Sequence, residues 1–464
     1  IGRMMRLAYL SPEVLERLLI HRQPPSVSIN ELVFATYLPW TKQIDRASCK
    51  IPEACRIFFL RGGKSMRPVT SRAWSFCRKH QLIGRDMLLH QHLSESWSHI
   101  QGQLFPRLQE EVGPLLECHR RLVAVLEMAR IEAFVQMIHG LPGRPPADRF
   151  ALARAYTAKA VLNLPTTAML IDRLQVDAAL RRLCGWEFVR SIPSETTFSR
   201  AFDEFAGYGL PERVHEALVK RTLGDDHIVG HISRDATAIE VREKPVKVEQ
   251  PAEEPKRKRG RPRNGEVMPA KEPRRLERQG AMSLSQMLAD LPTACDVGAK
   301  RNAKGYKTSW TGYKLHIDTA DGDIPVSCIL TSASVHDSQV AIPLATMTSA
   351  RCTNLYDLMD SAYDAPEIKE KSHALGHVPI IDHKTRRGEK EAIAAEARAR
   401  RVAGYELAED LRYDQRSSAE RVNANLKDNC GGKFVRVRGP AKVMCHLMFG
   451  IVVIAAEQLL RLVT

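Results

Sequence analysis

The spacing of apolar residues changes along the chain and divides it into three parts. From about 95 to 224, apolar residues recur at the three- and four-residue intervals of helices. From 225 to 464, alternating stretches typical of strands appear between further helices. The pattern is least certain in residues 1–86, on which we base no functional argument.

The middle part predicts an all-helical domain. Ser194 stands at an N-cap position of its third helix, on which Thr197 and Arg200 should be exposed. Two helices, a turn and a third short helix are compatible with a helix-turn-helix DNA-binding domain. An ordinary helical bundle fits the same pattern equally well. The three predicted helical segments are 145–164, 167–186 and 192–209.

The last part predicts an α/β domain in which helices flank a mixed sheet. A strand over 227–241 carries Asp235, and Asp321-Gly322-Asp323 marks the turn of a hairpin. Another strand ends at Asp360, and in a sheet of this order it should neighbour the first strand. The further predicted elements are a helix at 338–350, a helix before 376, a strand at 377–384 and a helix at 413–427.

An insertion from about 242 to 307 separates the first two strands of this domain. It is rich in Pro, Lys, Arg and Glu, a composition that does not build a core. Within it, KRKRGRPRNG resembles an AT-hook, in which Arg259 and Arg261 would enter a narrow A·T-rich minor groove. A solvated basic linker that touches phosphates without specificity is the alternative.

Composition favours a polyanionic partner. The formal net charge is +15 and the pI is about 9.4, so DNA is the first candidate and an anionic membrane surface the second. The apolar run 443–460 contains His446 and Glu457, and we expect a buried helix there and no membrane partner. No signal peptide opens the chain, and the ten cysteines form no C-x-x-C pair, which favours the cytoplasm.

Three carboxylates stand where this topology can bring them together: Asp235, Asp360 and Glu420. Acids gathered in one cleft repel each other unless divalent cations neutralise them, and Mg²⁺ prefers such oxygen ligands. Two ions about 4 Å apart can activate the attacking oxygen and stabilise the leaving oxygen of a phosphodiester. The sequence therefore predicts a two-metal site.

The helix that carries Glu420 has an unusual polar stripe. Tyr413, Arg416, Glu420 and Lys427 fall within about 60° of one another around an ideal helix, while apolar residues occupy the other side. The structural alternative is an exposed helix with an i,i+4 pair between Arg416 and Glu420.

These four residues match the Tyr-x2-Arg-x3-Glu-x6-Lys signature of one branch of the bacterial insertion-sequence DDE transposases. The chain resembles that family from about 95 to 464, including the segments RDATAIE, WTGYKLH, SASVHDS and MDSAYDAPEI. The resemblance implies a ribonuclease-H-like fold, two Mg²⁺ ions for which Mn²⁺ can substitute, and no small-molecule cofactor. It implies cleavage at the terminal inverted repeats and joining of the 3′ ends to target DNA by a homodimer associated with the nucleoid.

By the same resemblance, Asp235, Asp360 and Glu420 are metal ligands, and Tyr413, Arg416 and Lys427 hold DNA phosphates. Trp310 is a candidate for stacking on a displaced base, although a buried core tryptophan fits its sequence better. Two other functions stay open: a nuclease of this fold that does not join DNA, and a DNA-binding relic of a transposase.

The N-terminal segment has a resemblance of its own. RLAYLSPEVLERLLIHRQPPSVSINEL is similar to the tail of large serine recombinases, and we expect an upstream read-through with Met87 as an alternative start.

Overall fold

The computed structural model describes residues 89–136, 146–224, 227–246, 273–301, 305–382, 389–405 and 407–464, which lie within one structural unit. The recombinase-like segment 1–86 and the AT-hook-like residues Arg259 and Arg261 lie outside the described residues.

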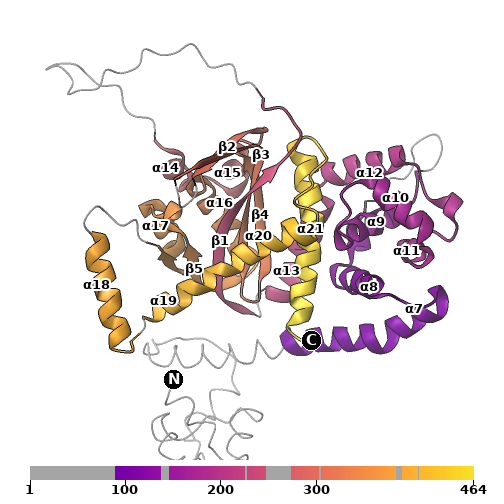
Figure 1. The fold of residues 1–464 in the computed structure, drawn as a ribbon, viewed down its shortest axis with the longest axis horizontal. Coiled ribbons are helices and arrows are strands. Elements are labelled where there is room, and N and C mark those ends of the chain that lie inside the picture. Colours follow the sequence, from indigo (N-terminus) through magenta and orange to yellow (C-terminus); the bar gives the residue numbers. More distant parts are fainter. Residues whose placement is uncertain are drawn as a thin grey trace, which may run out of the picture. The chain divides into compact units, whose positions relative to one another are not determined.

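The described residues between 89 and 224 are helical, as the sequence predicts (Figure 1). Asp148 caps α9 by accepting hydrogen bonds from the backbone of Phe150 and Ala151. Ser194 occupies the predicted N-cap position of α12. The elements are residues 89–99, η2 (Ile100–Leu104), α7 (Phe105–Val112), α8 (Glu117–Ala129), η3 (Ile131–Phe134), α9 (Arg149–Val161), α10 (Thr167–Val176), α11 (Ala178–Cys184), η4 (Val189–Ser191), α12 (Glu195–Gly207) and α13 (Leu210–Leu223).

The single helix predicted over 167–186 is wrong, because the chain breaks at Asp177. This residue ends α10 with an extended backbone, and its side chain accepts a hydrogen bond from Leu180 N to begin α11. Its carboxylate also lies 2.9 Å from His119 Nε2. A short acidic side chain that satisfies the free N–H groups of a new helix makes such a break inexpensive.

Six strands form one mixed sheet, in the order β2-β3-β1-β5-β6, with β4 also paired to β3. β1 is antiparallel to β3 and parallel to β5, so the predicted contact between the two strands that precede the aspartates is confirmed. This arrangement is consistent with the expected ribonuclease-H-like fold. The strands are β1 (Ile228–Glu240), β2 (Asp296–Arg301), β3 (Lys307–Ala320), β4 (Ile324–Ser332), β5 (Thr353–Met359) and β6 (Val378–Ile381).

The insertion is only partly the coreless segment that its composition predicts. Its second half forms α14 (Arg275–Gln279), α15 (Leu284–Asp290) and β2, which extends the sheet along β3. Met287 of α15 is buried against Ala341 and Ile342. The prediction failed because it rested on the composition of the whole insertion, in which the charged first half outweighs the short apolar run that follows it.

Helices cover both faces of the sheet. Leu315 and Ile317 of β3 share a core with Val422 and Leu426, whereas Ile329 of β4 packs on the opposite side with α16. The remaining elements are α16 (Ser338–Ser349), η5 (Ser361–Tyr363), α17 (Pro366–Ala374), α18 (Glu389–Val402), α19 (Ala408–Tyr413), η6 (Asp414–Arg416), α20 (Ser417–Asn429) and α21 (Pro440–Arg461).

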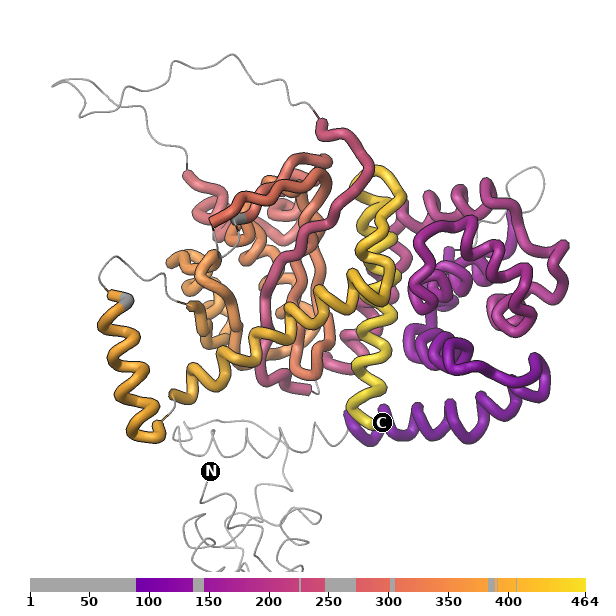
Figure 2. Tube along the Cα trace, viewed as in Figure 1, coloured from indigo at the N-terminus to yellow at the C-terminus, as the bar shows by residue number. Residues whose placement is uncertain are grey.

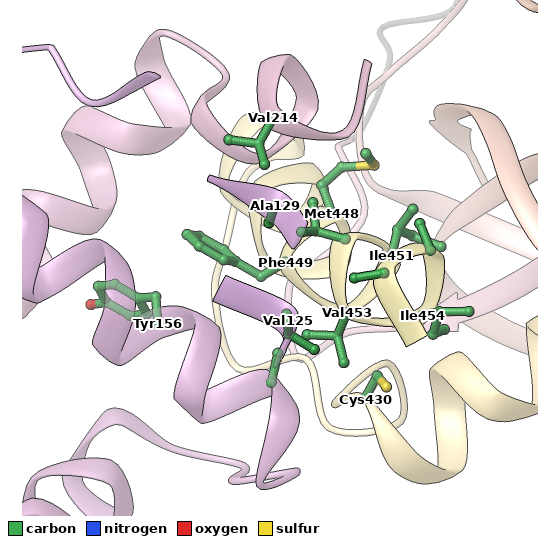
Figure 3. Packing of buried hydrophobic residues seen from close by; sticks show 14 of the residues in the cluster. Val125, Ala129, Tyr156, Val214, Cys430, Met448, Phe449, Ile451, Val453 and Ile454 are labelled. Carbon is green, nitrogen blue, oxygen red and sulfur yellow. The ribbon is translucent and has the colours of Figure 1, made fainter. Parts of the chain in front are cut away.

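Helix α21 lies between the sheet and the helical part (Figure 1). Figure 3 shows its residues Phe449 and Val453 packed beside Val125 and Tyr156 of α8 and α9. Among the described helices it alone is long and apolar enough to cross a bilayer, but 83% of its most apolar window is buried inside the protein. The expected buried helix is therefore confirmed.

Gly450 makes the close packing of α21 possible. A Cβ at this position would lie 2.6 Å from the carbonyl oxygen of Cys430 and 2.8 Å from Leu426 Cδ1. We therefore expect Gly450→Val to lower the free energy of unfolding by about 1–3 kcal/mol through overpacking. Urea unfolding followed by circular dichroism measures this loss.

Gly207, the last residue of α12, is the matched control. A Cβ there would meet nothing within 4 Å, so Gly207→Ala should raise the free energy of unfolding by up to about 1 kcal/mol. Equal effects of the two substitutions would contradict the packing argument.

Candidate active site

The parallel pairing of β1 with β5 places Asp235 and Asp360 at neighbouring positions. The last paired residues are Ser233 and Leu358, and each aspartate follows two residues later on its own strand. β5 ends at Met359, and the Asp360 carboxylate then caps η5 by accepting a hydrogen bond from Ala362 N. Asp235 and Asp360 are therefore neighbours at the point where β5 ends.

A fully buried ion pair fixes this end of the sheet. Arg234 donates two hydrogen bonds of 2.8 Å to Asp318, which also accepts one of 2.7 Å from Thr348. Arg234 Nη1 lies 3.2 Å from the sulfur of Met359, next to Asp360. One residue before Asp235, the guanidinium thus connects β1, β3 and β5.

Helix α20 crosses β1 (Figure 2). Asn423 Nδ2 donates a hydrogen bond of 3.0 Å to Asp235 Oδ2. At the start of the helix, Ser233 Oγ donates to the carbonyl oxygen of Gln415. Val422 and Leu426 fill the core beneath the helix. This packing holds α20 to the strand at two places on either side of Glu420.

Glu420 lies one turn before Asn423, but its carboxylate is paired with a cation. Arg416 Nη2 donates to Glu420 Oε1 at 2.7 Å, and the Glu420 side chain is 56% exposed. The predicted i,i+4 pair is therefore confirmed. Arg416 also lies over the ring of Tyr413, 5.7 Å from its centroid. The predicted single helix over 413–427 is interrupted by η6, so Tyr413 ends the preceding helix α19.

The surroundings of Asp235 disfavour its negative charge. Burial raises its pKa, the charges of Asp360 and Asp337 raise the pKa further, and Arg416 opposes the rise. Among the described residues Asp235 forms no ion pair. An ionised Asp235 therefore gains from any cation that enters the space beside it.

The donors present fit a hard cation only in part. No group of three or more His, Cys, Asp or Glu side chains in the described ranges is close enough to hold a metal ion. Asn423 Oδ1 and the Tyr363 hydroxyl, however, are buried without a hydrogen-bond partner in the part of the chain that the structure describes. Burial raises the pKa of the Tyr363 hydroxyl, and the negative charges of Asp235 and Asp360 raise it further. Asp235, Asp360 and these oxygens form an oxygen-rich set suited to Mg²⁺, and Glu420 would complete it if released from Arg416.

The other predicted DNA contacts within the described residues lie on α20, β3 and α12. Burial lowers the pKa of Lys427, and the nearby charge of Lys300 on β2 adds to this effect. Trp310 is half-buried, its indole N–H donates to the Tyr313 carbonyl oxygen, and a Cβ on Gly298 would clash with its ring. Thr197 is half-buried and Arg200 is exposed on α12.

Sequence reasoning missed two contributors. Asn423 resembles any polar helix residue, yet it lies on the buried side of α20 with Val422 and Leu426. Asp337, which precedes α16, makes no cap hydrogen bond and pairs instead with Lys314 at 2.9 Å.

Two family models match the chain. One, described as the transposase DDE domain, matches residues 232–455, and the other, described as a transposase domain (DUF772), matches residues 110–204. Both matches support a DDE transposase family. No curated protein and no solved structure matched the chain. The DDE-domain match spans the sheet, the insertion and α20, and the second match spans most of the helical part.

The buried pair of Arg234 and Asp318 gives a stability prediction. Arg234→Met leaves the Asp318 carboxylate buried without its cation, and we expect a loss of about 3–5 kcal/mol in the free energy of unfolding. Replacing both residues, as Arg234→Met with Asp318→Leu, removes the unpaired charge and should recover most of that loss. Urea unfolding of the single and double variants measures both effects. A double variant no more stable than the single one would show that packing, not charge, dominates here.

Proposed function

We propose that this chain is a transposase that cleaves DNA at the ends of its insertion sequence and joins the 3′-hydroxyl ends to target DNA. The observation that carries the proposal is the neighbouring placement of Asp235, within β1, and Asp360, just after the end of β5, together with the contact of Asp235 with α20, the helix of Glu420. The transposase DDE domain match covers all three residues.

In this proposal Asp235, Asp360 and Glu420 hold two Mg²⁺ ions. When bound, the ions would activate the attacking oxygen and stabilise the leaving oxygen of the phosphodiester. Asn423 donates a hydrogen bond to Oδ2 of Asp235 and would hold that carboxylate in place. Arg416 serves as a counter-charge for Glu420 until DNA arrives, and its planar fork then suits a phosphate.

The remaining cations would guide DNA to this site. Tyr413, at the end of α19, precedes Glu420 in the chain and Lys427, in the last turn of α20, follows it. Helix α12 would present Thr197 and Arg200 to the terminal repeats. Trp310, already packed against β2, would support that strand or stack on a base at its exposed edge. Pairing of two DNA ends implies a homodimer on DNA, and a substrate in the nucleoid implies the cytoplasm.

The acids give the first functional prediction. Asp235→Asn, Asp360→Asn and Glu420→Gln should each reduce Mg²⁺-dependent cleavage by more than the roughly 100-fold that loss of an outer partner of a metal ligand costs. The assay uses duplexes that carry the DNA bounding the coding region. Activity retained in any one variant would remove that residue from the site.

Stability supplies an independent measure of Asp235. Because its pKa in the folded protein is raised above the unfolded value, ionisation of this carboxylate costs stability at neutral pH. Asp235→Asn should therefore raise the Tm of the protein in EDTA at neutral pH. The difference should vanish below about pH 4, where the unfolded carboxyl is also protonated. Asp323→Asn, which removes a carboxylate ion-paired to Arg421, should not stabilise.

Joining distinguishes a transposase from a nuclease. Pre-cleaved 3′-hydroxyl ends incubated with a supercoiled target should yield joined products. Cleavage without joining would favour the nuclease, and binding without either reaction would favour the relic.

Asn423 should behave as a positioning residue for Asp235. Asn423→Leu keeps a similar volume but removes the donor to Asp235, so we expect Mn²⁺ affinity to fall by about 10–100-fold. Isothermal titration of the DNA-free protein with Mn²⁺ measures this without any turnover. Asn425→Leu is the control, because Asn425 lies on the same helix and accepts its hydrogen bond from Asn429 instead. Unchanged Mn²⁺ affinity in Asn423→Leu would refute this role.

A further inference from the structure

A second polar pocket lies away from the acids, between the helical part and the segment that leads into α21. Its volume is about 450 Å³. Tyr156 and Lys159 of α9 and Phe202 of α12 line it from the buried side. Arg436 and Arg438, which are exposed and follow α20 in the chain, line its opening.

The lining of this pocket is cationic. Lys442 is neutralised by an ion pair of 2.7 Å with Asp203. This leaves Lys159, Arg436 and Arg438 against one further carboxylate, Glu195. Hydroxyl groups at the start of α10 and on α12 add neutral hydrogen-bond donors; they belong to Thr167 and Ser199. Cations and hydroxyl groups around a cavity are the usual partners of phosphate oxygens.

Lys159 is the unusual member of the group. It is only 8% exposed, and its side chain has no hydrogen-bond or ion-pair partner within the described ranges. Burial lowers its pKa to about 8. The neighbouring His446, whose Nε2 lies 3.0 Å from the carbonyl oxygen of Gly431, offers no compensating charge because an imidazole is either neutral or cationic. A buried cation without a counter-charge lowers the stability of the fold. A protein keeps such a destabilising charge where an anionic ligand binds beside it and neutralises it.

The position of the pocket indicates which anion it takes. One side of α12, with Glu195 and Ser199, faces the pocket, while Thr197 and Arg200 are placed elsewhere on the same helix. If α12 contacts DNA as proposed above, the backbone of that DNA passes beside the pocket. A DNA strand presents phosphates one at a time, which suits a site with one deep cation and two at the opening.

We propose that this pocket binds a backbone phosphate of DNA lying along α12, with Lys159 at its base and Arg436 and Arg438 at its opening. The inference rests on the proposed function in taking DNA as the ligand and α12 as a helix that contacts it. It places a DNA contact at the junction between the helical part and the segment that joins α20 to α21.

The test compares the salt dependence of DNA binding in wild type, Lys159→Met and Lys159→Arg. Binding of a short labelled duplex of random sequence is followed by fluorescence anisotropy over a range of salt concentrations. Loss of one phosphate contact should reduce the slope of log K against log salt by about 0.9 in Lys159→Met. Lys159→Arg keeps the charge and should keep the slope.

Thermal unfolding without DNA gives a second signature. Lys159→Met removes an unpaired buried charge, so its Tm should rise although its DNA affinity falls. Lys220→Met is the control, since Lys220 is half-exposed on α13 and already paired with Glu216 at 2.6 Å. This control should change neither the Tm by more than a degree or two nor the DNA affinity.

An unchanged salt slope in Lys159→Met, with or without a higher Tm, overturns the proposal. Inorganic phosphate provides a further arm. If it stabilises wild type but not Lys159→Met while the DNA slopes agree, the pocket takes a free anion and not DNA. Mn²⁺ titration of Lys159→Met should match wild type, so failure at this pocket and failure of the proposed active site are distinguishable.

Discussion

Burial of α21 is the constraint on which the placement of the other elements depends. The helix is apolar on all sides, so it needs protein cover around its whole circumference. The sheet and α20 supply one side of that cover, and α8, α9, α12 and α13 supply the other. Gly450 lets the end of α20 approach to contact distance. A hydrophobic requirement far from the acids thereby fixes where α20 crosses β1, and with it the position of Glu420 relative to Asp235.

Two adjacent charged residues on β1 have opposite electrostatic surroundings. Arg234 is buried, and its positive charge is compensated by the Asp318 carboxylate. It therefore stabilises the strand and has no unpaired charge with which to bind a ligand. Asp235, the next residue, has Asn423 as its hydrogen-bond donor but no ion pair within the described residues, and acidic neighbours raise its pKa. A protein of ordinary stability does not keep such a charge for structural reasons, since an apolar residue would stabilise the fold more. The contrast between these neighbours separates scaffold from site.

The sequence predicts the parts of this structure that depend on local signals or simple topology. The hairpin turn at Gly322 and Asp323, the strand ending before Asp360, and the buried helix α21 all follow from short patterns. The neighbouring positions of Asp235 and Asp360 follow from the order of the strands.

The remaining features depend on contacts between residues distant in the chain. Nothing local distinguishes Asn423 from other polar residues of α20, because its role comes from the crossing of that helix over β1. The pair between Lys314 and Asp337 depends on the register of β3 with β4. The break at Asp177 depends on its contact with His119, 58 residues earlier. The roles of Asn423 and of the pair between Lys314 and Asp337 are therefore tertiary contacts, whereas α14, α15 and β2 were missed because of the composition of the insertion.

Asp235 and Lys159 are both buried charges without an ion-pair partner among the described residues, one negative and one positive. The segment from α20 to α21 lies beside both of them. Asp235 lies under α20, whereas Lys159 borders the pocket that Arg436 and Arg438 enclose just after that helix ends. Gly431 and His446, at the junction with α21, also contact the surroundings of Lys159. A cation at the first residue and a phosphate at the second would each relieve a buried charge, and both would hold the same stretch from α20 to α21 in place. Because ligands that stabilise one arrangement of a shared segment favour each other's binding, DNA at the pocket and metal at the acids should bind with positive coupling.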